Sequence, residues 1–271
     1  ASLRDRYPRL IHASLSAYGQ TGPERDKPGY DAVLQARTGI AAVTGEPDGP
    51  PVRAGVSILD VGGGTWLALG IIAALYERER TGEASAVATS LFETGAAWVA
   101  YHLSAHQIAG TASERHGSGH PAFSPYGIFR TKDGEICIGI GGDHLYEQFC
   151  EAIDRPDLIS DERFRTNADR SRHANELRME LERTFATKSA AEWAVELGDR
   201  GLPVDAVNKP EDLLLDRQSH ETGILQEIEG PLGRSLYIPG LPITFNGQRP
   251  TFRSPAPGLP ASDRPPSHEQ C

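Results

Sequence analysis

The sequence predicts an α/β fold, with the C-terminal part of a Rossmann-like large domain followed by a smaller α+β domain. Up to Ala109, short buried strands alternate with long helical patterns, as in a parallel sheet covered by helices. Beyond Gly127 the pattern changes to a hairpin followed by several helices. The length of 271 residues is sufficient for a large core and for two domains.

The first part contains two strand-to-helix units, which resemble the second half of a doubly wound sheet. A parallel sheet whose chain begins at its last strands is unusual, so we expect a fragment or an upstream segment supplied from elsewhere. The expected elements are a strand at Leu10–Ser16, a helix at Tyr30–Gly39 closed by Gly39, a strand-to-helix unit that contains Asp60 and runs to Arg80, a strand at Ala86–Leu91 and a helix at Phe92–Ala109.

One motif in this part points to chemistry. The apolar run Val56–Leu59 ends in Asp60, and Gly62, Gly63 and Gly64 follow, before a nearly uncharged helical pattern at 65–76 that we interpret as a buried helix. Consecutive glycines are costly in entropy and usually mark a close approach of the backbone. The dipole of a helix N-terminus favours an ionised carboxylate. The motif is typical of a nucleophile, a base or an anion site, and equally of a helix cap.

The second part follows a loop at 114–127 that is rich in glycine, histidine, serine and proline. Ser189 and Glu192 have the spacing of a capping box, which predicts a helix start. The chain from Arg249 is rich in proline and is expected to be extended or disordered. The expected elements are hairpin strands at Gly127–Phe129 and Glu135–Ile140, helices at Leu145–Ile153, Arg172–Phe185 and Ala190–Gly198, and short strands at Leu202–Val207, Gly223–Ile228 and Ser235–Ile238.

The composition excludes several classes of function. A net charge of −10 argues against a nucleic-acid or anionic-membrane partner. Three scattered cysteines form neither a disulfide scaffold nor a zinc motif, which favours a cytoplasmic protein. The N-terminus is too charged for a signal peptide, and no apolar run is expected to span a bilayer. His102 and His106 have helical i, i+4 spacing, but no further ligands cluster with them, so we predict no metal site.

An ordered set of motifs between residues 7 and 245 resembles the class III (family III) CoA-transferases, which include formyl-CoA:oxalate and carnitine-type transferases. More distant members of that family are the α-methylacyl-CoA racemases. The motifs are Ser16–Pro23, Pro28–Asp31 with Gln35-Ala36, Thr44–Pro47, Gly55–Asp60, Ala73–Arg78, Thr81-Gly82, His120-Pro121, Ser124–Tyr126 and Asp161–Phe164 with Thr166-Asn167.

The resemblance implies a reaction. Asp60 falls where the family carries a nucleophilic aspartate, and Tyr30 and Asp31 would accompany it as catalytic residues. CoA would pass from an acyl-CoA to a small carboxylic acid through an acyl-aspartyl anhydride and an aspartyl-CoA thioester. The CoA thioester is then a substrate, with no tightly bound cofactor. The resemblance also implies an interlocked homodimer. From the residues alone, Asp31 would equally serve as a first-turn residue of its helix.

Six further residues are candidates for CoA binding. Gly62, Gly63 and Gly64 would let CoA or the acyl group approach, and their amides would stabilise an oxyanion, unless they only pack helix against sheet. Lys27 is a candidate for the CoA phosphates, with a surface charge as the alternative. Gly119 and His120 belong to a loop that would cover Asp60, or form an ordinary interdomain loop.

Two other functions stay open. The racemases carry a histidine at the position of Tyr30, and the ordinary tyrosine pKa of about 10 suits α-proton exchange poorly, which favours acyl transfer. A truncated, inactive CoA-binding module is the other alternative, because the family's N-terminal segment is absent. The expected domains are the remainder of the large domain with the catalytic aspartate at 1–91, a linker helix at 92–116, a small α+β domain at 117–216, and a return segment with a proline-rich tail at 217–271.

Overall fold

A computed structural model of the chain describes residues 3–230 and 233–252. The chain forms two compact units, one up to residue 206 and one from residue 207 onward. The mixed α/β class expected from the sequence is confirmed, whereas the Rossmann-like assignment and the four-part domain division stay predictions.

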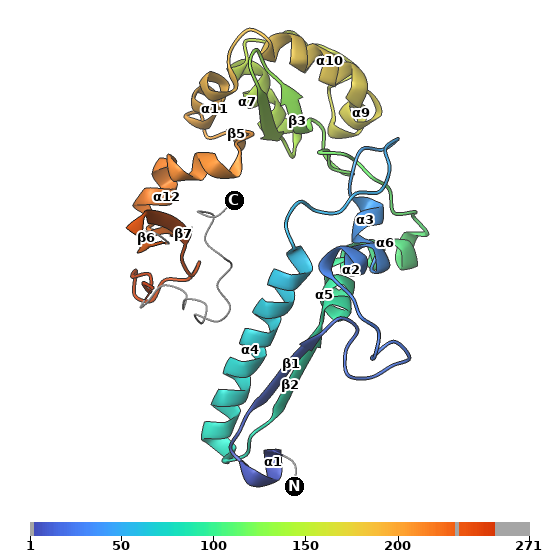
Figure 1. The fold of residues 1–271 in the computed structure, drawn as a ribbon. Coiled ribbons are helices and arrows are strands. Elements are labelled where there is room, and N and C mark those ends of the chain that lie inside the picture. Colours follow the sequence, from blue (N-terminus) through green and yellow to red (C-terminus); the bar gives the residue numbers. More distant parts are fainter. Residues whose placement is uncertain (1–2, 231–232, 253–271) are drawn as a thin grey trace, which may run out of the picture. The chain divides into compact units, whose positions relative to one another are not determined.

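The first unit opens with α1 (Leu3–Arg6) and then builds a parallel pair from β1 (His12–Ser16) and β2 (Ala86–Ser90). Their register runs from His12 opposite Ala86 to Ser16 opposite Ser90. Parallel strands require a crossover, and this one contains α2 (Asp31–Arg37), α3 (Ile40–Val43) and α4 (Ile58–Thr81). The long helix α4 runs beside both strands (Figure 1).

Helix α4 begins earlier than the sequence predicted. Ile58 is its first residue, so Asp60 lies in its first turn and all three consecutive glycines lie inside the helix. The expected strand before Asp60 is therefore wrong. At the other end, Gly82 adopts a φ of 80° and its amide bonds the carbonyl of Arg78, which closes the helix.

Glycines stabilise α4 by letting it approach the sheet. A Cβ on Gly63 would lie 2.9 Å from a methyl of Leu15, and one on Gly70 would lie 2.6 Å from a methyl of Val87. A Cβ on Gly62 would overlap the indole ring of Trp98. The entropic cost of glycine in a helix is thus offset by close packing against β1, β2 and the following helix.

The outward face of α4 is apolar and exposed. Ala74 is buried, but Ile72 on the opposite side is 63% exposed. The expectation of a buried helix is wrong, because the described residues cover only the side of α4 that faces the strands. Exposed apolar side chains on this helix are Val61, Trp66, Leu69, Ile72, Leu75 and Tyr76.

By length and composition alone, α4 would be able to cross a membrane, since its most apolar window has a mean hydropathy of 1.8. The expectation that no run is long and apolar enough is therefore wrong for this helix. Core helices of soluble proteins meet the same criterion.

Two helices replace the single one expected at 92–109. Helix α5 (Leu91–Trp98) is capped by Ser90, whose hydroxyl accepts a hydrogen bond of 3.0 Å from the amide of Glu93. Val99 interrupts the helix, and α6 (Ala100–Ala109) follows. A small core joins α2, α4 and α5, with Leu34, Ile40, Leu59, Leu91 and Val99 as its buried members.

The rest of the first unit is an antiparallel sheet covered by helices. The predicted hairpin is confirmed: β3 (Tyr126–Arg130) pairs with β4 (Glu135–Gly139), and β5 (Val204–Ala206) pairs with β4 on its other side. The capping box of Ser189 and Glu192 is also confirmed. The covering helices are α7 (Asp143–Ala152), α8 (Asp157–Ser160), α9 (Asn167–Arg172), α10 (Ala174–Phe185) and α11 (Ala190–Gly198).

The second unit holds η1 (Pro210–Leu214) and α12 (Arg217–Glu221), neither of which was predicted. Its hairpin of β6 (Leu225–Glu229) and β7 (Ser235–Pro239) matches two expected strands. Most of the proline-rich tail lies outside the described residues.

Candidate active site

Asp60 is the centre of the candidate site. It is the third residue of α4, where first-turn amides point toward the side chain. Its carboxylate is exposed and makes no hydrogen bond or ion pair with the residues that the structure describes. The side chain is therefore free to meet a substrate.

Asp31 lies beneath the same turn. One carboxylate oxygen accepts a hydrogen bond of 2.8 Å from the amide of Leu59, and the other accepts one from the side-chain amide of Gln35. Asp31 is 5% exposed and Gln35 is fully buried. The sequence predicted Asp31 as a catalytic residue, yet its oxygens are both engaged inside the protein. The hydrogen bond connects Asp31 to the first turn of α4, and its catalytic role stays a prediction.

Tyr30 precedes Asp31 and is 81% exposed. It occupies the N-cap position of α2 without a side-chain cap, and its phenol lies in solvent. Because Asp31 bonds the residue next to Asp60, the three predicted catalytic residues gather at the start of α4. Only Tyr30 and Asp60 present their side chains to solvent.

The three glycines do not act alike. Gly62 and Gly63 are buried against Trp98 and Leu15, so they pack the helix and do not open a binding surface. Gly64 is exposed, with no atom within 4 Å of a Cβ placed on it. All three amides lie inside α4, where i to i−4 hydrogen bonds engage helix amides, and their expected oxyanion role stays a prediction.

Lys27 is exposed but paired. Its amine lies 2.8 Å from Glu24, which also receives Arg37 at 3.4 Å. The hydrogen bond from Lys27 is the main reason that the pKa of Glu24 falls below its ordinary value. Lys27 would have to leave this pair to bind a phosphate.

Gly119 and His120 lie beside a cavity of about 760 Å³. The His120 ring stacks on Phe123 at 4.9 Å, and its Nδ1 accepts a hydrogen bond of 3.1 Å from the amide of Ala122. Polar and aromatic groups share the lining, which suits a molecule with a charged and an apolar part. Among the lining residues are Glu46, His116, Tyr126, Arg130, Arg178 and Glu182.

Arg115, which sequence reasoning missed, anchors the base of this loop. Its guanidinium donates to the carbonyls of Glu46, at 3.1 Å, and Gly49, at 2.7 Å, with longer bonds to Ala42 and Pro47. An arginine beside a turn gave no signal in the sequence, because its partners are backbone groups far away along the chain.

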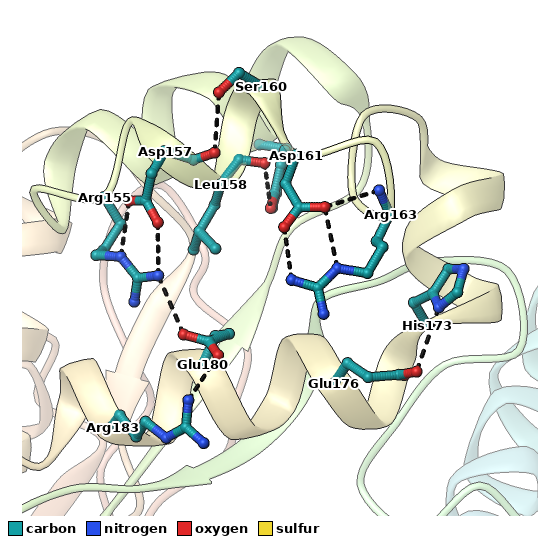
Figure 2. A network of polar contacts seen from close by, with 11 residues as sticks. Arg155, Asp157, Leu158, Ser160, Asp161, Arg163, His173, Glu176, Glu180 and Arg183 are labelled. Carbon is teal, nitrogen blue, oxygen red and sulfur yellow. Dashed lines mark hydrogen bonds and ion pairs between the residues drawn. The ribbon is translucent and has the colours of Figure 1, made fainter.

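A second polar group, shown in Figure 2, is structural. Arg155 joins Asp157 at 2.8 Å to Glu180 of α10 at 3.2 Å. The hydrogen bond from Arg155 lowers the pKa of Asp157, and the one from Arg163 lowers the pKa of Asp161. The Arg155 pairs join the start of α8 to α10, and the Arg163 pair closes within the loop that follows α8, so both are structural contacts.

Asp143 is also engaged in structure. It pairs at 2.8 Å with Arg170, whose fully buried guanidinium also bonds the carbonyls of Ser124 and Phe164. The amide of Asn167 donates to the same carboxylate at 2.8 Å. In the part of the chain that the structure describes, no group of three or more His, Cys, Asp or Glu residues is placed to hold a metal ion.

Comparison with known proteins finds one family over almost the whole chain. The sequence model described as CoA-transferase family III matches residues 1–262. The chain is 35% identical over 261 residues to an acetyl-CoA:oxalate CoA-transferase of Acetobacter aceti, a match that covers 93% of this chain and 64% of that protein. It is 31% identical to a succinyl-CoA:glutarate CoA-transferase of Mus musculus, with 93% and 58% covered.

The fold is also similar to that of solved structures. A crystal structure of a CAIB/BAIF family protein from Brucella suis matches with a TM-score of 0.82 and 30% identity, covering 95% of this chain and 67% of that one. The chain thus spans about three fifths of the length of the curated relatives it matches.

Proposed function

Because this chain belongs to CoA-transferase family III, we propose that it transfers CoA from an acyl-CoA donor to a small free carboxylic acid, with Asp60 as the nucleophile. The observation that carries the proposal is the placement of Asp60, exposed in the first turn of α4 above a built support. The named transferases of similar sequence support the class of reaction.

The proposed reaction has four steps, each an exchange at an acyl carbon. A carboxylate oxygen of Asp60 attacks the acyl carbon of the donor thioester, the C–S bond breaks, and the products are an acyl-aspartyl mixed anhydride and CoA thiolate. The thiolate attacks the aspartyl carbonyl, which releases the donor acid and leaves an aspartyl-CoA thioester. An acceptor carboxylate then attacks this thioester, which forms a new anhydride and frees the thiolate. The thiolate finally takes the acceptor acyl group and restores Asp60.

A carboxylate suits this sequence because its anhydride and thioester are comparable in energy to the substrate thioester. The dipole of α4 would stabilise an exposed carboxylate by only about 0.3–1 kcal/mol. Placement of Asp60, more than its electrostatic activation, is then the main contribution of the helix. The loop of Gly119 and His120 is proposed to shield the anhydride from water.

The geometry favours transfer over racemisation. Tyr30 is exposed and stands in place of the proton-exchanging histidine, and the ordinary tyrosine pKa of about 10 suits that exchange poorly. The alternative of an inactive CoA-binding module rests on the chain spanning about three fifths of the length of its curated relatives, whereas the exposed Asp60 carboxylate supports a reactive site.

We further propose that the protein is a cytoplasmic homodimer without a tightly bound cofactor. The exposed apolar face of α4 supports association, since apolar patches of this kind mark interaction surfaces. The scattered cysteines support a reducing compartment.

Trapping of the intermediate tests the proposal. The chain is incubated with acetyl-CoA or succinyl-CoA, quenched with hydroxylamine or borohydride, and digested for mass spectrometry. We expect a modified peptide containing Asp60 in the wild type and none in Asp60→Asn. Glu83→Gln, which removes an exposed carboxylate beyond the far end of α4, is the matched control and should react normally.

Absence of an adduct in a folded wild-type chain would reject the transferase proposal and leave the inactive module. Exchange of the α-proton of a 2-methylacyl-CoA in D₂O by the wild type would instead favour the racemase. We expect no such exchange.

A further inference from the structure

The start of α4 is capped from another helix. Ser57, at the N-cap position, makes no side-chain hydrogen bond to the first turn. Asp31, in the first turn of α2, takes over this role and accepts the amide of Leu59 at 2.8 Å. Leu59, whose amide donates to Asp31, directly precedes Asp60 in the chain.

Gln35 extends the support to the segment that leads into α4. Its side-chain nitrogen donates to Asp31, and its side-chain oxygen accepts a hydrogen bond of 2.9 Å from the amide of Ala54. The segment between Ala54 and Leu59 is therefore held at both ends by one connected pair of side chains.

The pair is buried among apolar side chains. Leu34 and Leu59, which flank it on α2 and α4, are both fully buried in the same small core. Within the described residues, no lysine, arginine or histidine pairs with Asp31, so its carboxylate depends on these two donors. Buried polar groups of this kind are costly when any partner is lost, and they specify one arrangement when all partners are present.

We propose that Asp31 and Gln35 are positioning residues, which hold the first turn of α4 in the register that presents the Asp60 carboxylate to the acyl-CoA. This inference rests on the proposed function of Asp60. We assign Asp31 no bond-making step, because each of its oxygens accepts a hydrogen bond inside the protein and the residue is 5% exposed. Displacements of about 1 Å at a reacting group cost roughly 100-fold in rate, so loss of the support is expected to slow chemistry more than binding.

An exchange of the two functional groups tests the idea. In Asp31→Asn/Gln35→Glu, the asparagine oxygen accepts from Leu59, its nitrogen donates to the new glutamate, and the other glutamate oxygen accepts from Ala54. Every hydrogen bond is retained, with carboxylate and amide exchanged and volumes unchanged. Gln35→Glu alone places two carboxylates together, and Asp31→Asn alone places two amide groups together.

The rate of adduct formation at Asp60 is measured at saturating acetyl-CoA, at a temperature where circular dichroism shows every variant folded. We expect each single variant to react roughly 10- to 100-fold more slowly with little change in half-saturating acetyl-CoA. We expect the double variant to recover to within about threefold of wild type, and Glu83→Gln to be unaffected.

Amide hydrogen exchange of the peptides containing Ala54 and Leu59 provides a readout independent of activity. Protection should fall in each single variant and return in the double variant. Native protection in a single variant would overturn the inference even if the wild type forms no adduct, a result that would reject the proposed function instead. Restored protection without restored adduct rate would also overturn it, and would make Asp31 a reacting group.

Discussion

Two regions of the first unit solve the problem of burying apolar side chains differently. In residues 126–206, one core of seventeen buried residues joins a three-stranded sheet to its helices. In residues 3–110, five buried residues form the core, while the longest helix leaves large apolar side chains in solvent. We call residues 126–206 the closed region, because their described apolar side chains gather in one core. We call residues 3–110 the open region, because the apolar face of α4 is uncovered by the described residues.

The helices explain the contrast. Helices α7, α10 and α11 each bury one apolar face in the core that they share with the sheet. Helix α4 is apolar all round, a pattern typical of helices that are covered on every side. Its glycine face meets the strands, and its face of larger side chains has no cover in the described residues. Stability is therefore concentrated in the closed region and the candidate chemistry in the open one.

The largest effect on stability is expected from the closed core. Phe149→Ala removes a fully buried ring that packs near Phe185, and should lower the free energy of unfolding by about 3–5 kcal/mol. Met179→Ala, at an exposed position on α10 of the same region, is the matched control and should change it by less than about 0.5 kcal/mol. Urea titration followed by circular dichroism measures both. Equal losses of unfolding free energy in the two variants would contradict the assignment of Phe149 to a packed core.

A smaller effect should separate the two faces of α4. Gly63→Ala should cost about 1–3 kcal/mol, because its new methyl would meet Leu15 in a packed interface. Gly64→Ala should stabilise the chain by about 0.5–1 kcal/mol, because its methyl meets open space and alanine favours a helix. Thermal unfolding of the two variants measures the difference. A loss in Gly64→Ala would mean that this face is covered.

Ile72→Glu addresses the open face directly. If α4 lies in the proposed homodimer, a charge at this exposed position should shift the protein to monomer in sedimentation velocity. The free energy of unfolding of the monomer should change by less than about 0.5 kcal/mol. A wild type that sediments as a monomer would contradict the proposed dimer.

The weakest effect is a pH dependence of the closed region. The pKa values of Asp157 and Asp161 are lowered in the folded chain, by hydrogen bonds from Arg155 and Arg163 respectively. Groups with a depressed folded pKa stabilise the protein above their unfolded pKa, about 3.9, and lose that contribution as the pH falls further. The acid unfolding midpoint of Asp157→Asn should therefore move slightly relative to wild type. Ion pairs near the surface contribute little to stability, so a large shift of the acid unfolding midpoint would contradict a minor role for the Asp157 pair.

Local signals in the sequence predicted much of the closed region. The capping box at Ser189 and the hairpin within 127–140 depend on residues close together in the sequence, and both are confirmed. The start of α4 was predicted wrongly because consecutive glycines usually interrupt helices, and only their packing against Trp98 and Leu15 stabilises them here. The candidate site shows the same division. Asp60 was predicted from a local motif. The hydrogen bonds of Gln35 and Arg115 were not predicted, because they join segments that are distant in the sequence.

The parallel pairing of β1 with β2 has a consequence for the order of folding. His12 pairs with Ala86 only after the whole crossover between them has been synthesised and has become compact. Strands β3 and β4, by contrast, are joined by a short turn. Contacts between distant segments are formed slowly, because the loop must be closed before any contact repays it. We expect the hairpin to form early on the emerging chain, and the strand pair beside α4 to be among the last elements to close.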